Sequence, residues 1–400
     1  MNKNIVLVIN CGSSSLKFSL IDPKTTEELV SGIGERLLSN DAVIKFKANG
    51  TKQTFDLPAP FDHQTAVAAL VDYLQQNNLQ QDVIAVGHRI VHGGEKYSQP
   101  ILINSDVKQT IKELSKLAPL HNPVNLIGVE AAERAFAGLP QVAVFDTAFH
   151  QTMPEKAFLY GIPYVLYKDH GIRSYGFHGT SHYYVSNQAA QMLGKKINNT
   201  SVIAAHLGNG CSVTAVKDGK SVDCSMGFTP LAGVMMGTRS GDIDPGIIFH
   251  LVDQLNYSVE QVSAMLNKES GLLGVSQMSN DCRTIEQAIF DSNDPQATLA
   301  MDIFSYRIAK SIASLTASLT NLDALVFTGG IGENSAYVRE QVVASLKLLN
   351  IVIDDAKNQE ICFGKSGNIA QASSTPCLVI PTNEELVIAE QSYQLLQEGK

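Results

Sequence analysis

Three short stretches of the sequence combine small residues, hydroxyl groups and charged side chains in patterns that could bind phosphate. The first is Asn10-Cys-Gly-Ser-Ser-Ser-Leu-Lys17, which lies between two apolar runs. Backbone N–H groups that approach a ligand closely, next to a lysine, suit a polyphosphate. The stretch is not a Walker A loop, because GxxxxGK[ST] is absent. Taken alone, it is better explained as a polar hairpin turn.

The second stretch repeats this pattern half a chain later and consists of His206, Leu207, Gly208, Asn209 and Gly210. Its glycines let the backbone come close to a ligand. A strand is predicted directly after it, where a dinucleotide-binding motif would have a helix. Two such loops facing each other would hold the β- and γ-phosphates of a nucleotide from both sides.

The third stretch is a predicted loop between a buried strand and a capped helix, formed by Gly329, Gly330, Ile331, Gly332 and Glu333. It is close to GxGxxG, and a strand predicted over residues 351–353 ends at Asp354, about where a ribose-binding acid is expected. A dehydrogenase is therefore an alternative. However, the third glycine is replaced by Ser335, and a dinucleotide-binding fold would leave both earlier loops unexplained.

Three arginines with glycine-rich or loop-like surroundings could hold anions: Arg89, Arg239 and Arg283. A guanidinium group in such a loop suits bidentate contact with carboxylate or phosphate, although each arginine taken singly could equally be a surface residue. Asp146 ends a predicted buried strand, where α/β sheets place residues that face a ligand. Its simpler interpretation is a helix N-cap.

Two histidines lie in loops flanked by glycine or proline, in Gly-Phe-His178-Gly-Thr-Ser and Ala-Pro-Leu-His121-Asn-Pro. The spacing of His178 and His182 suggests a zinc site, but the residues between them supply no HExxH general base. Most of the other histidines are expected to be solvated or packed.

The elements that must position these residues alternate between predicted strands and helices, which indicates an α/β fold. A chain of 400 residues is too long for one hydrophobic core. The pattern of strand, small-residue loop and strand occurs near the N-terminus and again after residue 200, so we expect a duplicated domain. The predicted domains are residues 1–150 with a C-terminal helix over about 384–400, and residues 151–383.

Composition excludes several classes of partner. The net charge of −9 argues against nucleic acid and anionic membranes, which need a basic face. No apolar segment approaches the roughly 20 residues needed to span a bilayer, and no signal-peptide pattern is present. Six scattered cysteines without a CxxC pair indicate neither a disulfide framework nor a zinc ribbon. We therefore expect a cytoplasmic enzyme that acts on small molecules.

Taken together, the motifs resemble the acetate kinase family, which is related to actin, Hsp70 chaperones and sugar kinases. The matching stretches span nearly the whole chain: VINCGSSSLKFSLID, GHRIVHGGEKY, APLHNP, VFDTAFHQTMP, YGFHGTSH, HLGNG, GTRSGDIDPG, FTGGIGEN and PTNEELVIA. The resemblance implies two duplicated actin-like, ribonuclease H-like domains with mixed sheets flanked by helices, with the active site in the cleft between them, and a homodimer.

The resemblance also implies a reaction, which is reversible, Mg²⁺-dependent transfer of a phosphoryl group from ATP to acetate, directly and in line, giving acetyl phosphate and ADP. Mn²⁺ is the implied substitute for Mg²⁺. Propionate and butyrate kinases of the same family are the nearest alternatives. An actin-like ATPase is a rival from another class, but it would leave the arginine, aspartate and histidine set without a role.

The implied roles divide into four groups. Those assigned to catalysis are Arg89, His121, Asp146, His178 and Arg239. Those assigned to the nucleotide are Lys17, His206, Leu207, Gly208, Asn209, Gly210, Asp281, Cys282, Arg283, Gly329, Gly330, Ile331, Gly332 and Glu333. Mg²⁺ would be held through water by Asn10 and Glu384, with Glu385 as the alternative to Glu384. The acetate pocket would be formed by Arg89, Val91, Leu120, Phe177 and Pro230.

Acetate, with a pKa of about 4, is already ionised at neutral pH and needs no general base. Asp146 is therefore expected to orient Mg²⁺ or an arginine.

Overall fold

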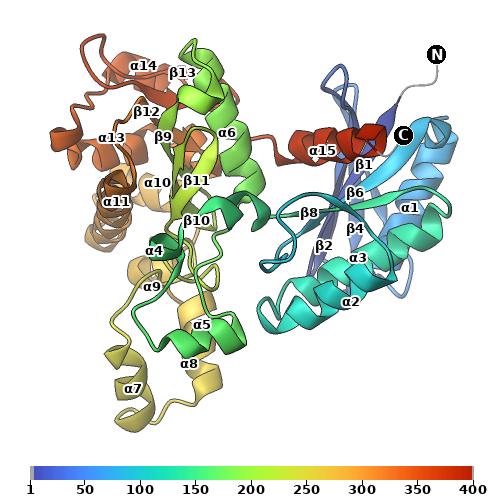
Figure 1. Ribbon diagram of the computed structural model, residues 1–400, viewed down its shortest axis with the longest axis horizontal. Helices are drawn as coiled ribbons and strands as arrows, with labels where there is room; N and C mark the ends of the chain where they lie inside the picture. Colours follow the sequence, from blue (N-terminus) through green and yellow to red (C-terminus); the bar gives the residue numbers. More distant parts are fainter. Residues whose placement is uncertain (1–3, 399–400) are drawn as a thin grey trace. The chain divides into compact units, whose positions relative to one another are not determined.

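The computed structural model describes residues 4–398, which form two compact units (Figure 1). The first unit draws on the chain up to Ala148 and again from Asn383, and the second comprises residues 149–382. No helix within the described residues has both the length and the apolar character to cross a bilayer.

The first unit is built on an eight-stranded sheet with the order β5-β4-β3-β2-β1-β6-β8-β7. Its central strands β1, β6 and β8 run parallel, and all other neighbours are antiparallel. The strands are β1 (Ile5–Gly12), β2 (Ser15–Asp22), β3 (Glu27–Glu35), β4 (Val43–Ala48), β5 (Thr51–Asp56), β6 (Val83–Ile90), β7 (Ile101–Leu102) and β8 (Gln141–Phe145).

Helices cover both faces of this sheet. Successive side chains of β1 point to opposite faces, so β1 contributes to the core on each side. Ile5, Leu7 and Ile9 join a core with α1 (His63–Gln76) and α3 (Asn122–Ala135). On the other face, Gly87 of β6 pairs with Val8 of β1 and lies against α15 (Glu384–Glu398). The C-terminal helix thus packs on the sheet that begins the chain (Figure 1).

The second unit repeats this arrangement with a six-stranded sheet of order β11-β10-β9-β12-β14-β13. Its strands are β9 (Ser201–Leu207), β10 (Cys211–Lys217), β11 (Lys220–Cys224), β12 (Ala324–Thr328), β13 (Gly367–Asn368) and β14 (Cys377–Val379). Strands β9, β12 and β14 are parallel, like β1, β6 and β8, and in both units the first of these strands forms an antiparallel hairpin with the strand that follows it in the chain. This shared order confirms the predicted duplication and the α/β class.

Residues of β9 also alternate between two faces. Val202 and Ala204 pack with α6 (Gly179–Met192), and α11 (Pro295–Leu315) contacts the same sheet. The remaining helices of the chain are α2 (Ser105–Glu113), α4 (Glu155–Phe158), α5 (Tyr164–His170), α7 (Gly246–Asp253), α8 (Val259–Lys268), α9 (Gly271–Ser276), α10 (Cys282–Ser292), α12 (Gly329–Asn334), α13 (Ala336–Ala344) and α14 (Asp355–Glu360).

Apart from the strand predicted over residues 351–353, the strands and helices predicted from apolar patterns are present. Several other elements are not recognisable in the sequence. Strand β3 contains Gly32, where a side chain would collide with the carbonyl of Lys45 and the ring of Phe18, so its strand pattern is interrupted. Strand β5 is exposed throughout and has no apolar face. The capped helix predicted after Glu333 is α13, which Ser335 caps and which ends at Ala344.

Two sequence-based predictions are wrong. Residues 329–334 form the short helix α12 rather than a loop. No strand covers residues 351–353; Ile353 makes an isolated bridge, and Asp354 caps α14 by accepting from Lys357 N–H. Asp354, the acid that the dehydrogenase alternative requires, therefore serves as a helix cap.

Close packing of α3 on β1 depends on Gly128, because a Cβ atom there would lie 2.2 Å from Sγ and 3.0 Å from Cβ of Cys11. We expect Gly128→Ala to destabilise the protein by about 1–3 kcal/mol through overpacking, although alanine is the better helix former. The measurement is urea-induced unfolding.

Cys11→Ala should recover part of that loss in the double variant, because it removes the nearest atom. Gly161→Ala is the control, since its added methyl group has no heavy atom within 4 Å. Wild-type stability of Gly128→Ala would contradict the packing argument.

Candidate active site

The carboxyl ends of the parallel strands β1, β6 and β8 bring three predicted site residues together, as expected where parallel strands end at one edge. Arg89 donates from Nε to Oδ1 of Asp146 at 2.9 Å and from Nη2 to Oδ2 at 2.6 Å. Its Nη1 lies 3.4 Å from Oδ1 of Asn10. Asp146 is buried, so this bidentate pair holds the guanidinium group in a fixed plane.

Lys17 and Glu384 belong to the same unit. Lys17 of β2 is directly opposite Asn10 of β1, so both side chains lie on one face of the sheet. Glu384 is the first residue of α15, which Asn383 caps by accepting from Leu386 N–H at 3.0 Å. The carboxylate therefore lies within the field of Arg89, Asp146 and Lys17.

This cluster of charges shifts the pKa values of its members. Burial raises the pKa of Glu384 to about 7; Arg89 and Lys17 oppose the shift, whereas Asp146 and Glu385 add to it. Burial would lower the pKa of Arg89, but Asp146 and Glu384 outweigh it and raise that pKa. An excess of carboxylates over cations around Glu384 favours a bound cation.

The other predicted residues of the first unit lie on or near α3. Val91 follows β6, is buried, and donates its N–H to Oδ1 of Asn125 at 3.0 Å. His121 occupies the N-cap position of α3. Leu120 is 61% exposed.

In the second unit, the register of β9 and β10 places His206 directly opposite Ser212, on the face that α6 covers. His178 caps α6 in a left-handed conformation, with φ of 57°. Its ring stacks on that of His206 with centroids 4.3 Å apart, and its Nδ1 lies 2.9 Å from the Ser212 hydroxyl. The sequence did not indicate Ser212, which becomes visible as a site residue only through strand pairing.

His178 and Arg239 approach the second glycine-rich stretch. A Cβ atom on Gly210 would lie 3.4 Å from both Nη1 of Arg239 and Nε2 of His178. Arg239 donates from Nη1 to the carbonyl of Pro230 at 3.1 Å, and Phe177, adjacent to His178, is buried. Four predicted site residues of this unit thus lie close to Gly210.

Three arginines of the chain differ in how their donors are used. Arg339, which is fully buried, donates to the carbonyls of Gly332, Glu333, Asn358 and Ile361 and to the Asn358 side chain. Arg89 is paired with a carboxylate. Burial lowers the pKa of Arg239, and no acidic side chain of the described residues forms an ion pair with it. Because a guanidinium has five N–H donors, Arg239 is the one suited to a bound anion.

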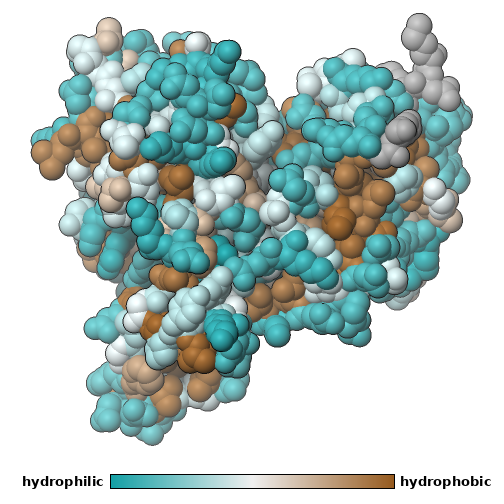
Figure 2. All heavy atoms as spheres, in the orientation of Figure 1, coloured by the Kyte–Doolittle hydropathy of each residue, from teal (hydrophilic) through white to brown (hydrophobic). Residues whose placement is uncertain are grey.

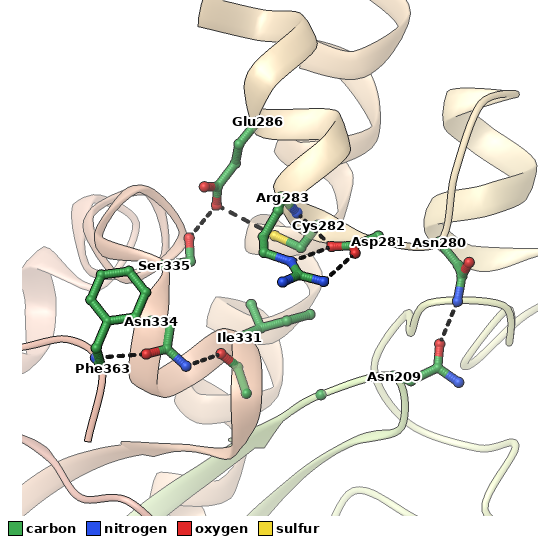
Figure 3. Close-up of a pocket in the computed structure, with 12 residues that line it drawn as sticks. Asn209, Asn280, Asp281, Cys282, Arg283, Glu286, Ile331, Asn334, Ser335 and Phe363 are labelled. Carbon is green, nitrogen blue, oxygen red and sulfur yellow. Dashed lines mark hydrogen bonds and ion pairs between the residues drawn. The ribbon is translucent and has the colours of Figure 1, made fainter. Parts of the chain in front are cut away.

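A cavity of about 620 Å³ joins three of the predicted nucleotide-binding stretches (Figure 3). This volume is within the range of small-molecule sites. Of the predicted residues, it is lined by Gly208, Asn209, Asp281, Cys282, Arg283, Gly330 and Ile331. The remaining lining residues were not predicted and are Asn280, Glu286, Asn334, Ser335 and Phe363.

Polar contacts fix the walls of this cavity. Asn280 donates to Oδ1 of Asn209 at 3.0 Å, which joins the glycine-rich stretch to the start of α10, and Arg283 pairs with Asp281 at 2.6 Å (Figure 3). Asn334 accepts from the N–H of Phe363 at 2.8 Å and so holds an 89% exposed ring at the rim. An aromatic ring there offers a surface on which a base could stack.

Glu333 faces away from the cavity lining. Its Oε1 accepts from the N–H groups of Gly329 at 2.9 Å and Thr382 at 3.0 Å. The carboxylate therefore connects the start of α12 to the chain segment that leads to α15. Of the predicted nucleotide residues, those that do not line this cavity are Lys17, His206, Leu207, Gly210, Gly329, Gly332 and Glu333.

Among residues 4–398, no group of three or more His, Cys, Asp or Glu side chains is arranged to hold a metal ion. His178 and His182 both lie within hydrogen-bonding distance of the Ser212 hydroxyl. Asn10 and Glu384 supply one amide oxygen and one carboxylate, a set that fits Mg²⁺ because this ion usually keeps several waters.

The raised pKa of Glu384 predicts a pH-dependent stability. Below the unfolded value of about 4.5 the group is neutral in both states, and as pH rises to about 7 the unfolded chain alone ionises. Without divalent cations, wild type should therefore lose about 1–3 kcal/mol relative to Glu384→Gln between pH 5 and pH 7.5. Urea unfolding at the two pH values tests this, and parallel pH curves for the two proteins would contradict it.

Comparison with known proteins identifies the family of the chain. The family model described as the acetokinase family matches residues 5–390. The acetate kinase of Shewanella baltica is 55% identical over 398 residues, which are 99% of this chain and 100% of that protein.

Solved structures show the same similarity. A propionate kinase from Francisella tularensis subsp. tularensis SCHU S4 is 48% identical, with a TM-score of 0.93 over 97% of this chain and 98% of that chain. The acetate kinase of Porphyromonas gingivalis is 43% identical, with a TM-score of 0.92 over 98% of this chain and 100% of that chain. On these matches over nearly its whole length, the chain belongs to the acetokinase family.

Proposed function

We propose that this phosphotransferase moves the γ-phosphoryl group of ATP to acetate, reversibly, and forms acetyl phosphate and ADP. One observation carries the proposal. Gly208 and Asn209 line the nucleotide-sized cavity, and Gly210 lies next to Arg239 and His178. A nucleotide with its base in the cavity would extend its phosphates along this stretch toward a cation and an imidazole.

The chemistry requires charge neutralisation rather than proton removal. Acetate is ionised at neutral pH, so the barrier includes the repulsion between two anions. Arg89 and Arg239 bind the carboxylate and the moving phosphoryl group, and His178 donates to the equatorial oxygens of an in-line transition state. Asp146 orients Arg89 through its bidentate contact. His121 acts nearby, and Lys17 contacts the nucleotide phosphates.

Asn10 and Glu384 would hold Mg²⁺ through water, with Glu385 as the alternative to Glu384 and Mn²⁺ as the substitute metal. A bound divalent cation neutralises charge on the phosphates. Its affinity should rise as Glu384 loses its proton, because metal ligands must be deprotonated.

The acyl specificity is assigned to a small apolar pocket of Val91, Leu120, Phe177 and Pro230. The similarity to a structure named a propionate kinase makes propionate the second candidate substrate, with butyrate behind it. Both are distinguished from acetate only by added methylene groups, so pocket volume decides between them.

A homodimer in the cytoplasm completes the proposal. None of the residues of α7 is buried, although it carries Ile247, Ile248 and Phe249. Figure 2 shows apolar side chains gathered in this lower part of the second unit. A second copy of the chain would cover them, because exposed apolar patches of this kind mark interaction surfaces. Sedimentation of wild type and Phe249→Glu tests the dimer.

The decisive experiment traps acyl phosphate with hydroxylamine in the presence of ATP, Mg²⁺ and acetate, propionate or butyrate. We expect hydroxamate with acetate, and less with the longer acids. ATP hydrolysis without any hydroxamate would support the actin-like ATPase instead.

The roles proposed for Arg89 and Arg239 predict different effects of their loss on turnover and on stability. Arg89→Ala and Arg239→Ala should each lower kcat/KM by about 100-fold or more, equivalent to about 3 kcal/mol of transition-state stabilisation. Arg89→Ala should also destabilise the fold, because it leaves Asp146 buried without its cation, whereas Arg239→Ala should not.

Arg36→Ala is the control, since Arg36 is exposed and pairs with Asp41 at the surface. Initial rates and urea unfolding of the three variants provide the test. Near-normal turnover in either site variant would exclude that arginine from catalysis.

The pocket assignment predicts that Val91→Ala raises the ratio of kcat/KM for propionate over acetate by about tenfold, chiefly through KM. The variant removes two methyl groups, about the space of the added methylene. The Val91 N–H keeps its bond to Asn125, so the backbone stays in place. Val129→Ala, at a fully buried position of α3, is the control for a cavity elsewhere. An unchanged ratio in Val91→Ala would make Val91 a core residue.

A further inference from the structure

Ser212 lies between two histidines of the second unit. Its hydroxyl oxygen is 2.9 Å from Nδ1 of His178 and 2.7 Å from Nε2 of His182. Ser212 and His182 are completely buried. A hydroxyl group has one proton and two lone pairs, so Ser212 can donate to at most one imidazole. If it accepted from both rings, its buried proton would have no acceptor, because the two ring nitrogens are its hydrogen-bond partners among the described residues.

Two arrangements give the hydroxyl proton of Ser212 an acceptor. In the first, His182 donates from Nε2–H to Ser212, and Ser212 donates to a bare Nδ1 of His178. In the second, every donor is reversed, so that His178 carries its proton on Nδ1 and His182 carries its proton on its own Nδ1. The arrangements therefore differ in which nitrogen of each ring is protonated.

The environment of His182 distinguishes them. Its Nδ1 is buried and has no hydrogen-bond partner among the described residues. The second arrangement would leave an N–H donor buried without an acceptor there, whereas the first leaves only a lone pair. Orphaned buried N–H groups are rarer than unsatisfied acceptors. Burial, with His150 and His206 nearby, also holds the pKa of His182 well below its usual value, so this ring is neutral.

We propose that Ser212 is a positioning residue that keeps His178 neutral and protonated on Nε2. A doubly protonated His178 would donate to Ser212 from Nδ1, which would leave either the Ser212 proton without an acceptor or an orphaned N–H on Nδ1 of His182. The neighbouring guanidinium of Arg239 also disfavours a second cation. The chain from His182 through Ser212 thus sets the protonation of His178 without touching a substrate.

The tautomer decides what Nε2, the other nitrogen of the His178 ring, offers to a ligand. Nε2 of His178 is, like Nη1 of Arg239, 3.4 Å from the position of a Cβ atom on Gly210. An N–H there donates to a phosphoryl oxygen, whereas a bare nitrogen would repel it. This consequence for turnover rests on the proposed function, but the tautomer itself does not.

The test begins with native protein carrying ¹⁵N-labelled histidine. Long-range proton–nitrogen NMR spectra distinguish a protonated from a bare ring nitrogen, and the His178→Gln variant assigns the His178 signals by their loss. We expect His178 to be protonated on Nε2 and bare on Nδ1 at neutral pH. Protonation on Nδ1 would overturn the proposal even if no variant of Ser212 folds.

Ser212→Ala tests the role of the hydroxyl. We expect a mixture of His178 tautomers and a fall in kcat of about tenfold, as for other groups that orient a functional histidine, with KM for ATP changed less than about twofold. Ser186→Ala is the matched control, because Ser186 is equally buried on α6 but donates to the carbonyl of Tyr183.

The experiments distinguish failure of the role assigned to Ser212 from failure of the proposed function. A single unchanged tautomer and unchanged kcat in Ser212→Ala would remove Ser212 from its assigned role. The expected tautomer in a protein that forms no acyl hydroxamate would retain the inference and reject the proposed function.

Discussion

The cost of removing a guanidinium group from water constrains the whole site, because each buried arginine must find acceptors. Arg339 finds them in backbone carbonyls and thereby holds α12 against α14. Arg89 finds them in Asp146, which cannot then serve as a free base. Arg239 has few protein acceptors and is left for an anion. Depending on its partners, an arginine of this chain therefore joins two helices, presents an oriented cation or is available to bind an anion.

The duplicated sheet provides two edges with related geometry and different chemistry. In the first unit, the edge collects Asn10, Arg89 and Asp146, and α15 adds two glutamates to it. In the second unit, the corresponding hairpin carries His206 and Ser212. The charged edge suits a metal and a carboxylate, and the histidine edge suits a phosphoryl group. The division follows from strand register, which decides which side chains share a face.

The histidine edge also shows how a neutral donor is maintained among cations. The His178 ring stacks on that of His206, and the nearby guanidinium of Arg239 disfavours a second cation there. A serine between two imidazoles can set their tautomers because it has a single proton. Burial makes the choice of tautomer energetically important, since bulk water cannot reach the ring nitrogen that has no partner.

The sequence by itself determined the α/β class, the duplication, most of the central strands and three of the stretches that line the cavity of the second unit. These features depend on local apolar patterns and on glycine-rich turns, which each stretch carries independently. Only the tertiary structure decided that residues 329–334 are helical, that Asp354 caps α14, that Glu333 binds backbone rather than the cavity, and that Ser212 joins two histidines. Those features depend on which distant backbone groups lie within hydrogen-bonding distance, and that is set by strand pairing and helix packing rather than by neighbours in the chain.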